Sequence, residues 1–368
     1  MRKTAEVILA PEANWIEPVT KCGIFPGMTR LSDGSFALLM VSGSEFESAD
    51  HRIVAYRGSA DGETWELFGE QGEQRSNGSI FTTSVKPSAL PDGRILALGY
   101  GFERKIPELS LSDYAEKFGC FPEVRNFVRY SSDGGRSYSQ PEFFDTGIGG
   151  CEFSGPALQL KDGRLLAFGA PFNLEKSGQT GYCFESCDGG GSWKRKSIFF
   201  NGGSKTAWEC RSAELKDGRI IVVIWVFDLE NGTHLNNHIA VSGDGGESFT
   251  ILDTGLPGQA SNLLASKKNP DHFYLLQARR EGENPGIYLT ECRLSSGNEL
   301  HCGSTEMLFD AAGGSNVDGA ITGQFKNLKF GQPSLQRTAD GKVLLLFWRY
   351  NNSAERYEVV IQKFDSSI

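Results

Sequence analysis

Ser186-Cys-Asp-Gly-Gly-Gly-Ser-Trp193 is one of four segments that combine a serine, an Asp-Gly pair, a small hydroxyl residue and an aromatic residue. In such a turn the Asp carboxylate can accept backbone N–H bonds, the glycines permit a positive φ, and the aromatic ring packs beneath. Each segment is therefore predicted to be a self-contained turn between two strands. The other three are Ser59-Ala-Asp-Gly-Glu-Thr-Trp65, Ser132-Asp-Gly-Gly-Arg-Ser-Tyr138 and Ser242-Gly-Asp-Gly-Gly-Glu-Ser-Phe249.

A second repeat consists of an apolar segment, then Asp-Gly, then an apolar run, as in Leu31-Ser-Asp-Gly-Ser-Phe-Ala-Leu-Leu-Met40. Asp-Gly between two apolar runs predicts a β-hairpin, because a type I′ turn needs positive φ. Six hairpins along the chain indicate a repeat architecture, and we expect one domain over residues 1–368. The other copies are 90–98, 160–169, 215–226, 338–347 and a degenerate one at 266–277, where Asn269-Pro270-Asp271 supplies the turn.

Composition narrows the classes of function. The net charge is −9, which argues against nucleic acid as a partner because an acidic protein displaces few counterions from phosphates. The longest apolar run, 220–227, has the length of a strand and not of a membrane-spanning helix. No apolar leader follows Met1, so we expect a cytoplasmic protein, or a secreted or periplasmic one if a leader has been removed. The oligomeric state stays open.

Eight cysteines are scattered along the chain without a CxxC spacing. We interpret them mostly as free, buried thiols. In an oxidising compartment Cys183 could bridge to Cys187, or Cys292 to Cys302. This spacing and the five histidines do not fit a zinc site. We therefore expect neither a metal nor another cofactor.

The four turns are similar to Asp boxes, the BNR repeats of the sialidase (neuraminidase) superfamily, and the resemblance covers nearly the whole chain. In that superfamily an Asp box joins the third and fourth strands of a propeller blade. With six hairpins, the resemblance implies an all-β fold: a six-bladed β-propeller of four-stranded antiparallel blades. It also implies a sialidase-like glycosidase, a hydrolase whose partner is a carbohydrate.

Two segments depart from the simple repeat. The second blade is longer than its neighbours, which places an insertion at about 103–124. Ser110-Leu-Ser-Asp-Tyr-Ala-Glu-Lys-Phe118 within it could form one or two helical turns, with Ser110 or Ser112 as the N-cap. The ring must also close, and we expect residues 5–10 to form the outermost strand of the last blade, whose third strand is 358–364.

Glu209 is the first candidate for catalysis. Trp208-Glu-Cys-Arg211 resembles the sialidase segment in which a glutamate opens the inner strand of the fourth blade and polarises the nucleophile. Glu209 and Arg211 alternate onto one face of that strand. An ordinary ion pair near a strand end is the alternative interpretation.

Two further carboxylates are candidates. Asp50 lies on a loop of the first blade where sialidases carry their acid/base aspartate, and Glu45 and Glu47 are rivals on the same loop. Glu152 is expected to open the third inner strand, where a second carboxylate near Glu209 would suit a retaining or inverting pair. The candidates for substrate binding are Arg211, His51, Arg279, Arg280, Arg349, Tyr350 and Trp208.

The sialidase pattern is incomplete here. Sialidases bind a sugar carboxylate with three arginines and attack the sugar with a tyrosine. The first arginine is replaced by Ile24-Phe25-Pro26, the second by Trp225-Val-Phe-Asp228, and the tyrosine by Gln332-Pro333-Ser334. Arg279 or Arg280 could be the third. Apolar residues cannot replace a bidentate arginine clamp, so ordinary sialidase activity is not the favoured prediction.

The favoured prediction is a glycoside hydrolase that uses two carboxylates drawn from Asp50, Glu152 and Glu209. Exo-arabinanases, which share the fold, use carboxylates without the arginine clamp. A sialidase proper, a polysaccharide lyase with a base and an arginine from His51, Tyr350 and Arg349, and a non-catalytic glycan-binding propeller stay open as alternatives.

Overall fold

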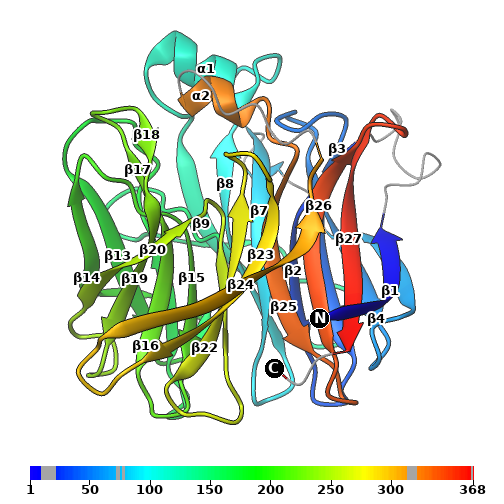
Figure 1. Ribbon diagram of the computed structural model, residues 1–368. Helices are drawn as coiled ribbons and strands as arrows, with labels where there is room; N and C mark the ends of the chain where they lie inside the picture. Colours follow the sequence, from blue (N-terminus) through cyan, green and yellow to red (C-terminus); the bar gives the residue numbers. More distant parts are fainter. Residues whose placement is uncertain (10–21, 72–74, 77–78, 313–320, 366–367) are drawn as a thin grey trace.

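The computed structural model describes residues 1–9, 22–71, 75–76, 79–312, 321–365 and 368. Six antiparallel sheets form the blades of a β-propeller (Figure 1). The first strands of most neighbouring blades contact one another, and between blades 2 and 3 the Ser88 hydroxyl donates to Ala157 O, so these inner strands surround the ring axis. The all-β, six-bladed fold predicted from the hairpin repeat is confirmed.

The first three blades follow one another along the chain. Blade 1 contains β2 (Cys22–Arg30), β3 (Phe36–Gly43), β4 (Arg52–Gly58) and β5 (Trp65–Glu70). Blade 2 contains β7 (Ser79–Ala89), β8 (Ile95–Glu103), β9 (Val124–Ser131) and β10 (Glu142–Phe144), with the short β6 (Arg75–Ser76) beside β7. Blade 3 contains β11 (Leu158–Gln159), β12 (Leu165–Gly169), β13 (Gln179–Ser186) and β14 (Lys194–Gly203).

The last three blades complete the ring. Blade 4 contains β15 (Trp208–Glu214), β16 (Ile220–Trp225), β19 (Asn236–Ser242) and β20 (Thr250–Pro257), and the loop between β16 and β19 carries β17 (Phe227–Asp228) and β18 (Thr233–His234). Blade 5 contains β21 (Asn262–Ala265), β22 (His272–Arg279), β23 (Gly286–Leu294) and β24 (Leu300–Asp310). Blade 6 contains β25 (Phe330–Arg337), β26 (Val343–Asn351), β27 (Arg356–Asp365) and β1 (Arg2–Leu9).

The third inner strand is shorter than the sequence indicates. We expect a strand from Glu152 to Leu160, but only Leu158–Gln159 pairs regularly with β12. Pro156 has no N–H to give to a ladder, which explains the interruption. Before it, the N–H of Glu152 still donates to Ala170 O at 2.8 Å.

The repeated Asp-Gly turns are held by their aspartates. Asp188 accepts hydrogen bonds from the Ser186 hydroxyl at 2.8 Å and from the Ser192 N–H at 2.9 Å, while Trp193 Nε1 donates to Gly190 O at 3.0 Å. The bonds from Ser192 lower the pKa of Asp188 to about 2. The turn of the second blade uses Ser131, one residue before the serine quoted above.

The chain ends meet in blade 6. β1 pairs antiparallel with β27 from Arg2 opposite Asp365 to Leu9 opposite Val359, so the N-terminal strand completes the last blade as expected. Residue 10 of the predicted strand lies outside the described residues. This pairing joins the first and last parts of the chain and closes the ring.

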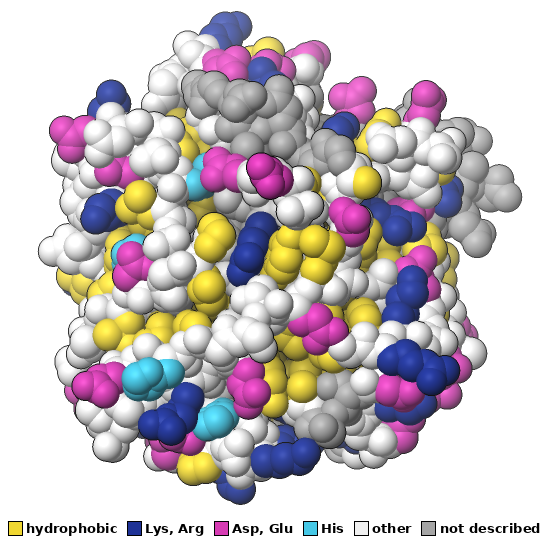
Figure 2. Space-filling view, viewed as in Figure 1, with side chains coloured by type: hydrophobic (Ala, Val, Ile, Leu, Met, Phe, Trp, Pro, Cys, Tyr) yellow, Lys and Arg dark blue, Asp and Glu magenta, His cyan; other side chains and the backbone are white. Residues whose placement is uncertain are grey.

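Apolar side chains fill the space between neighbouring blades. One core cluster joins blades 1 and 6 around Trp348, Phe36 and Val359. On the face shown in Figure 2, acidic and basic side chains are interspersed. Neither helix of the described residues is long and apolar enough to cross a bilayer. The eight cysteines are free thiols, and the sulfur atoms of Cys292 and Cys302 lie 3.1 Å apart.

Two short helices form a cap at one end of the ring (Figure 1). α1 (Leu111–Phe118) lies in the insertion of blade 2, and its N-cap is Ser110, which accepts a hydrogen bond from the N–H of Asp113. α2 (Ile321–Phe325) precedes β25. Lys326, just after α2, donates to Asp113 at 2.7 Å and to Glu116 at 3.2 Å. We call α1, α2 and Lys326 the cap.

The Asp-Gly turns make stability depend on pH. The ordinary pKa of 3.8 falls to about 2 for Asp188 in the folded protein. A depressed pKa stabilises the fold above pH ~4, and this contribution is lost as the pH falls through ~2. We expect Asp188→Asn to lower the free energy of unfolding at pH 7 and to flatten its decline between pH 4 and 2, as measured by urea unfolding.

The matched control is Asp253→Asn, because Asp253 is an exposed carboxylate on β20 that accepts a hydrogen bond from the N–H of Gly255. This variant should retain the wild-type pH dependence. An equal decrease in the free energy of unfolding in both variants would show that the hydrogen bonds between serine and aspartate in the turn do not stabilise the fold specifically.

Candidate active site

Three inner strands begin with the same unusual backbone. Phe25, Glu209 and Gln332 have φ values of 52°, 44° and 47°, in the left-handed region that non-glycine residues seldom occupy. Each lies where the ladder of its strand shifts register, on β2, β15 and β25. Such a conformation costs about 1–3 kcal/mol and persists only where the surroundings enforce it. The three bulges therefore mark one constrained end of the ring.

Glu152 and Glu209 meet at this end. The backbone N–H of Glu209 donates to Glu152 Oε2 at 3.2 Å, and the Ser154 hydroxyl donates to Glu152 Oε1 at 2.8 Å. Burial, followed by the negative charge of Glu209, raises the pKa of Glu152 to about 7. A carboxyl group with this pKa holds a proton near neutrality and can deliver it. The sequence predicted both residues, and the structure brings them together.

Arg211 accompanies the pair. Its Nη2 lies 3.4 Å from Glu209 Oε2, and Nη1 donates to Cys210 O at 3.2 Å. Gly155 makes this close approach of blades 3 and 4 possible, since a Cβ there would lie 2.8 Å from Cys210 O. The Glu209–Arg211 ion pair, which was the alternative interpretation of this segment, is thus present on β15, and the backbone N–H of Glu209 binds the Glu152 carboxyl group.

Two buried groups near the pair were not predicted. Tyr100 lies on β8, and burial, with the charges of Glu152 and Glu209, raises the pKa of its hydroxyl. Lys86 lies on β7 and is only 2% exposed. In the sequence Lys86 stands in an ordinary strand pattern, so nothing there separates it from a surface lysine. Lys86, Tyr100, Glu152, Glu209 and Arg211 are called the axial cluster below.

Arg280 brings an unsatisfied guanidinium to the same region. It is 2% exposed, its Nε donates to Phe330 O at 3.0 Å, and Nη1 and Nη2 have no hydrogen-bond partner among the described residues. The negative charge of Glu209 acts on it, which places the two groups near one another. Buried donors without partners are rare in proteins and suit a ligand that supplies acceptors.

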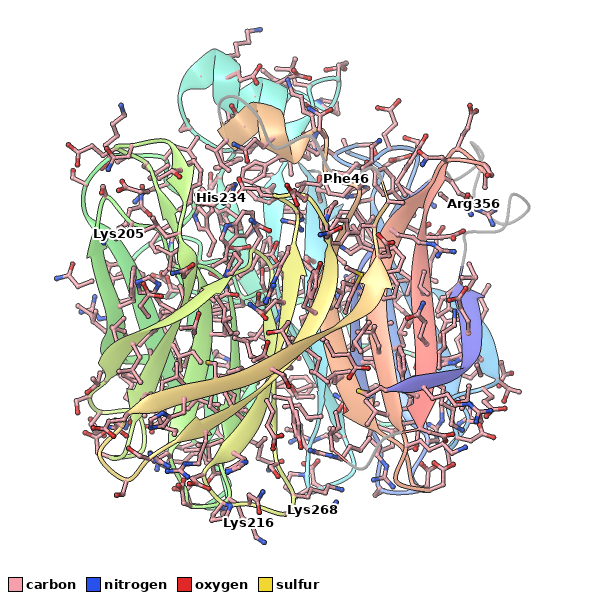
Figure 3. All side chains as sticks on the ribbon, viewed as in Figure 1. Phe46, Lys205, Lys216, His234, Lys268 and Arg356 are labelled. Atoms are coloured by element: carbon pink, nitrogen blue, oxygen red, sulfur yellow. The ribbon has the colours of Figure 1, made fainter. Side chains whose placement is uncertain are left out.

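Aromatic rings flank this guanidinium. Trp208 stacks on Phe227 with ring centroids 5.8 Å apart, and Trp225 lies 5.3 Å from the Arg280 guanidinium. Trp225 Nε1 donates to His234 Nδ1 at 3.1 Å, and burial lowers the pKa of His234 to about 4. His234 and Phe46 both lie toward the capped end of the ring (Figure 3). Trp208 therefore stands in an aromatic wall beside the carboxylate pair.

Asp50 and His51 lie in their own loop, apart from the pair. Asp50 accepts from the Ser44 N–H at 3.1 Å and from the Ser48 hydroxyl at 2.5 Å, and these bonds outweigh desolvation and lower its pKa. His51 Nε2 lies 2.7 Å from Glu45 O, and burial lowers the pKa of His51 to about 4. The contacts of both side chains order the loop, which lines a groove of about 650 Å³.

The other predicted binding residues also face elsewhere. Arg279 donates to Gln277 Oε1 at 2.9 Å and stacks over Tyr288. Arg349 pairs with Glu358 at 2.8 Å, and Lys329 lies over the ring of Tyr350. Arg349 and Tyr350 line a separate groove of about 490 Å³. Their roles in binding stay predictions.

Comparison with solved structures defines the fold class. A protein of unknown function from Dyadobacter fermentans aligns with a TM-score of 0.70 at 19% identity, covering 98% of each chain. The NanB sialidase from Streptococcus pneumoniae gives 0.64 at 13% identity, covering 100% of this chain and 71% of that one. This is a sialidase-like six-bladed propeller.

An enzyme of different specificity is equally similar to this propeller. The α-L-arabinanase from Penicillium chrysogenum aligns with a TM-score of 0.65 at 12% identity, covering 99% of this chain and 98% of the other. No family model and no curated protein sequence matches the chain. At these identities the propeller likeness concerns the fold alone.

The raised pKa of Glu152 gives the site a signature in stability. Since its pKa rises from 4.5 to about 7 on folding, the folded state binds this proton more tightly than the unfolded state. The associated stability is present below pH ~4.5 and is lost as the pH rises through ~7. We expect Glu152→Gln to remove this decline, so that the variant is more stable than the wild type at pH 8 in urea unfolding.

Glu185→Gln provides the comparison, because Glu185 is on the same blade but pairs with Arg164 and Lys196. That variant should keep the decline between pH 4.5 and 7. If Glu152→Gln also kept this decline in stability, the pKa of Glu152 would not be raised on folding.

Proposed function

We propose that the protein is a glycoside hydrolase that acts on a terminal sugar, with Glu152 as general acid and Glu209 as nucleophile or general base. The observation that carries this proposal is the hydrogen bond from the backbone N–H of Glu209 to the Glu152 carboxyl group, whose pKa is about 7. Glycoside hydrolysis needs one protonated and one ionised carboxyl group beside the scissile bond. The propeller likeness to a sialidase and an arabinanase supports a carbohydrate as the substrate.

The chemistry assigns one step to each carboxyl group. Glu152, protonated near neutral pH, donates its proton to the glycosidic oxygen as the bond to the leaving group breaks. Glu209, paired with Arg211 at 3.4 Å, supplies negative charge to the developing oxocarbenium ion, either by direct attack or by activating water. If Glu209 attacks the sugar directly, Glu152, now an anion, takes a proton from the water that hydrolyses the glycosyl–enzyme bond; if Glu209 activates the water, Glu209 takes that proton and Glu152 is reprotonated from solvent.

Groups around the pair are suited to hold a sugar. The free Nη1 and Nη2 of Arg280 can donate to sugar hydroxyls or to a carboxylate. The rings of Trp208 and Trp225 pack against each other, and Trp225 lies beside these donors. Burial of the axial cluster limits water and strengthens each electrostatic contact. We assign the acid to Glu152 and not to Asp50, because the hydrogen bonds of Asp50 stay within its loop.

The test uses pairs of aryl glycosides with two leaving groups. The panel contains a sialoside, an arabinofuranoside, a rhamnoside, a fucoside and a glucuronide, each as the methylumbelliferyl and the dinitrophenyl derivative. Dinitrophenolate leaves without a proton, so Glu152→Gln should lose about 100-fold or more in kcat only with the methylumbelliferyl substrate. Glu209→Gln should lose activity with both. Wild-type activity should fall as the pH rises above ~7, where Glu152 ionises.

Glu185→Gln serves again as the control and should turn over the substrate normally. Equal activity of Glu209→Gln and wild type would refute the assigned roles. Turnover of the sialoside would identify a sialidase proper. An unsaturated product from an acidic polysaccharide would identify a lyase, and binding on a glycan array without turnover would identify a binding propeller.

A further inference from the structure

Lys86 uses all of its hydrogen-bonding capacity inside the protein. Its Nζ contacts Phe25 O at 2.7 Å, Pro26 O at 3.1 Å and the Gln332 side-chain oxygen at 3.0 Å. An ammonium group has three N–H donors and no acceptor, whereas a neutral amine has two donors and a lone pair. Three acceptors around one nitrogen therefore fit the charged form. No donor of Lys86 is left over for a ligand.

The backbone around Lys86 is shaped to surround this ammonium. Phe25 and Gln332, with their positive φ values, belong to the bulges of β2 and β25. A Cβ at Gly27 would lie 2.8 Å from Lys86 Cδ, so the glycine provides the space through which the lysine side chain passes. One ammonium from blade 2 thus binds the unusual backbone of blade 1 and a side chain of blade 6.

The same ammonium stands within electrostatic reach of the carboxyl pair. Burial, and next the charge of Arg211, lower the pKa of Lys86, while the charges of Glu209 and Glu152 act in the opposite direction. The titratable groups coupled electrostatically to Glu152 are Glu209, Cys210 and Arg211 from β15, Tyr100 from β8 and Lys86 from β7. Arg280, from the end of β22, acts on Glu209.

We propose that Lys86 is a positioning residue for the Glu152–Glu209 pair: its three hydrogen bonds fix the bulges of blades 1 and 6 and hold an ammonium ion within electrostatic reach of the two carboxyl groups. A cation there opposes the effects of burial and of Glu209 on Glu152. Without it, Glu152 would release its proton only at a higher pH. The catalytic consequence rests on the proposed function, but the charge of Lys86 and its effect on Glu152 do not require a substrate.

The first test follows the titration of Glu152 by NMR of protein labelled with ¹³C at the glutamate carboxyl, with the signal assigned through Glu152→Gln. Replacing Lys86 by methionine should raise the pKa of Glu152 by about one unit. Lys86→Arg keeps a positive charge and should keep the wild-type titration. An unchanged or lowered pKa of Glu152 in Lys86→Met would overturn the proposal.

Lys363→Met is the matched control. Lys363 is also buried, but it pairs with Glu63 and Asp340 in another part of the ring. Loss of a buried lysine should destabilise both variants, whereas only Lys86→Met should shift the titration of Glu152. A shift of equal size in Lys363→Met would mean that general loosening, and not the charge of Lys86, changes Glu152.

The second measurement needs no substitution, and so it decides the matter even if Lys86→Met does not fold. In wild-type protein labelled with ¹⁵N at the lysine side chain, the Lys86 signal at pH 8 should show three attached protons that exchange slowly. A neutral amine would overturn the proposal. Both measurements stand apart from the glycoside panel, so failure of the hydrolase assignment and failure of the Lys86 inference are distinguishable.

Discussion

The pairing of β1 with β27 is the interaction on which the ring depends. A propeller blade contacts only its two neighbours, so the first and last blades must be joined by something other than chain order. Here the N-terminal strand becomes the outermost strand of blade 6, and the hydrogen-bonded ladder from Arg2 to Leu9 ties the two ends together. With the ring closed, the inner strands are fixed around the axis and their first residues converge.

Bringing the starts of the inner strands together around the axis costs free energy, and this cost is concentrated at one end of the ring. Three inner strands have a left-handed residue near their start, and acidic and basic groups are buried together. Such an arrangement does not maximise stability, because a buried carboxyl group resists ionisation and a buried guanidinium needs acceptors. Regular hairpins and hydrogen-bonded Asp-Gly turns in the same chain offset this cost. The proposed reaction therefore accounts for this strained end of the ring better than stability does.

The fold could be predicted from the sequence because it rests on local patterns. Asp-Gly pairs between apolar runs specify hairpins by backbone geometry, and five of them, with the degenerate turn at 269–271, give the six blades. The insertion helix followed from the same kind of reasoning, with Ser110 or Ser112 as the expected cap, and the structure has Ser110 in that place. The short third inner strand did not, because the effect of Pro156 on pairing with β12 depends on where the partner strand ends.

The candidate site was only partly accessible to such reasoning. Glu209 could be placed from the resemblance of its segment, and Glu152 from an expected strand start, although only Leu158–Gln159 forms a regular strand there. Lys86 and the open donors of Arg280 depend on side chains from other blades, so no local pattern reveals them. Asp50 shows the opposite case. Its position along the chain suited an acid, but its carboxylate accepts hydrogen bonds from Ser44 and Ser48.

The labelled residues of Figure 3 separate the two ends of the ring: Lys216 and Lys268 mark the hairpin end, and His234 and Phe46 mark the capped end. The hairpin turns that fix the backbone of each blade lie at the first end, and the buried charged side chains lie at the second. Loops of the capped end can therefore diverge in length and composition while the hairpins remain the same. Because of this division, substitutions in the loops of the capped end can change which ligand is bound while the fold stays the same.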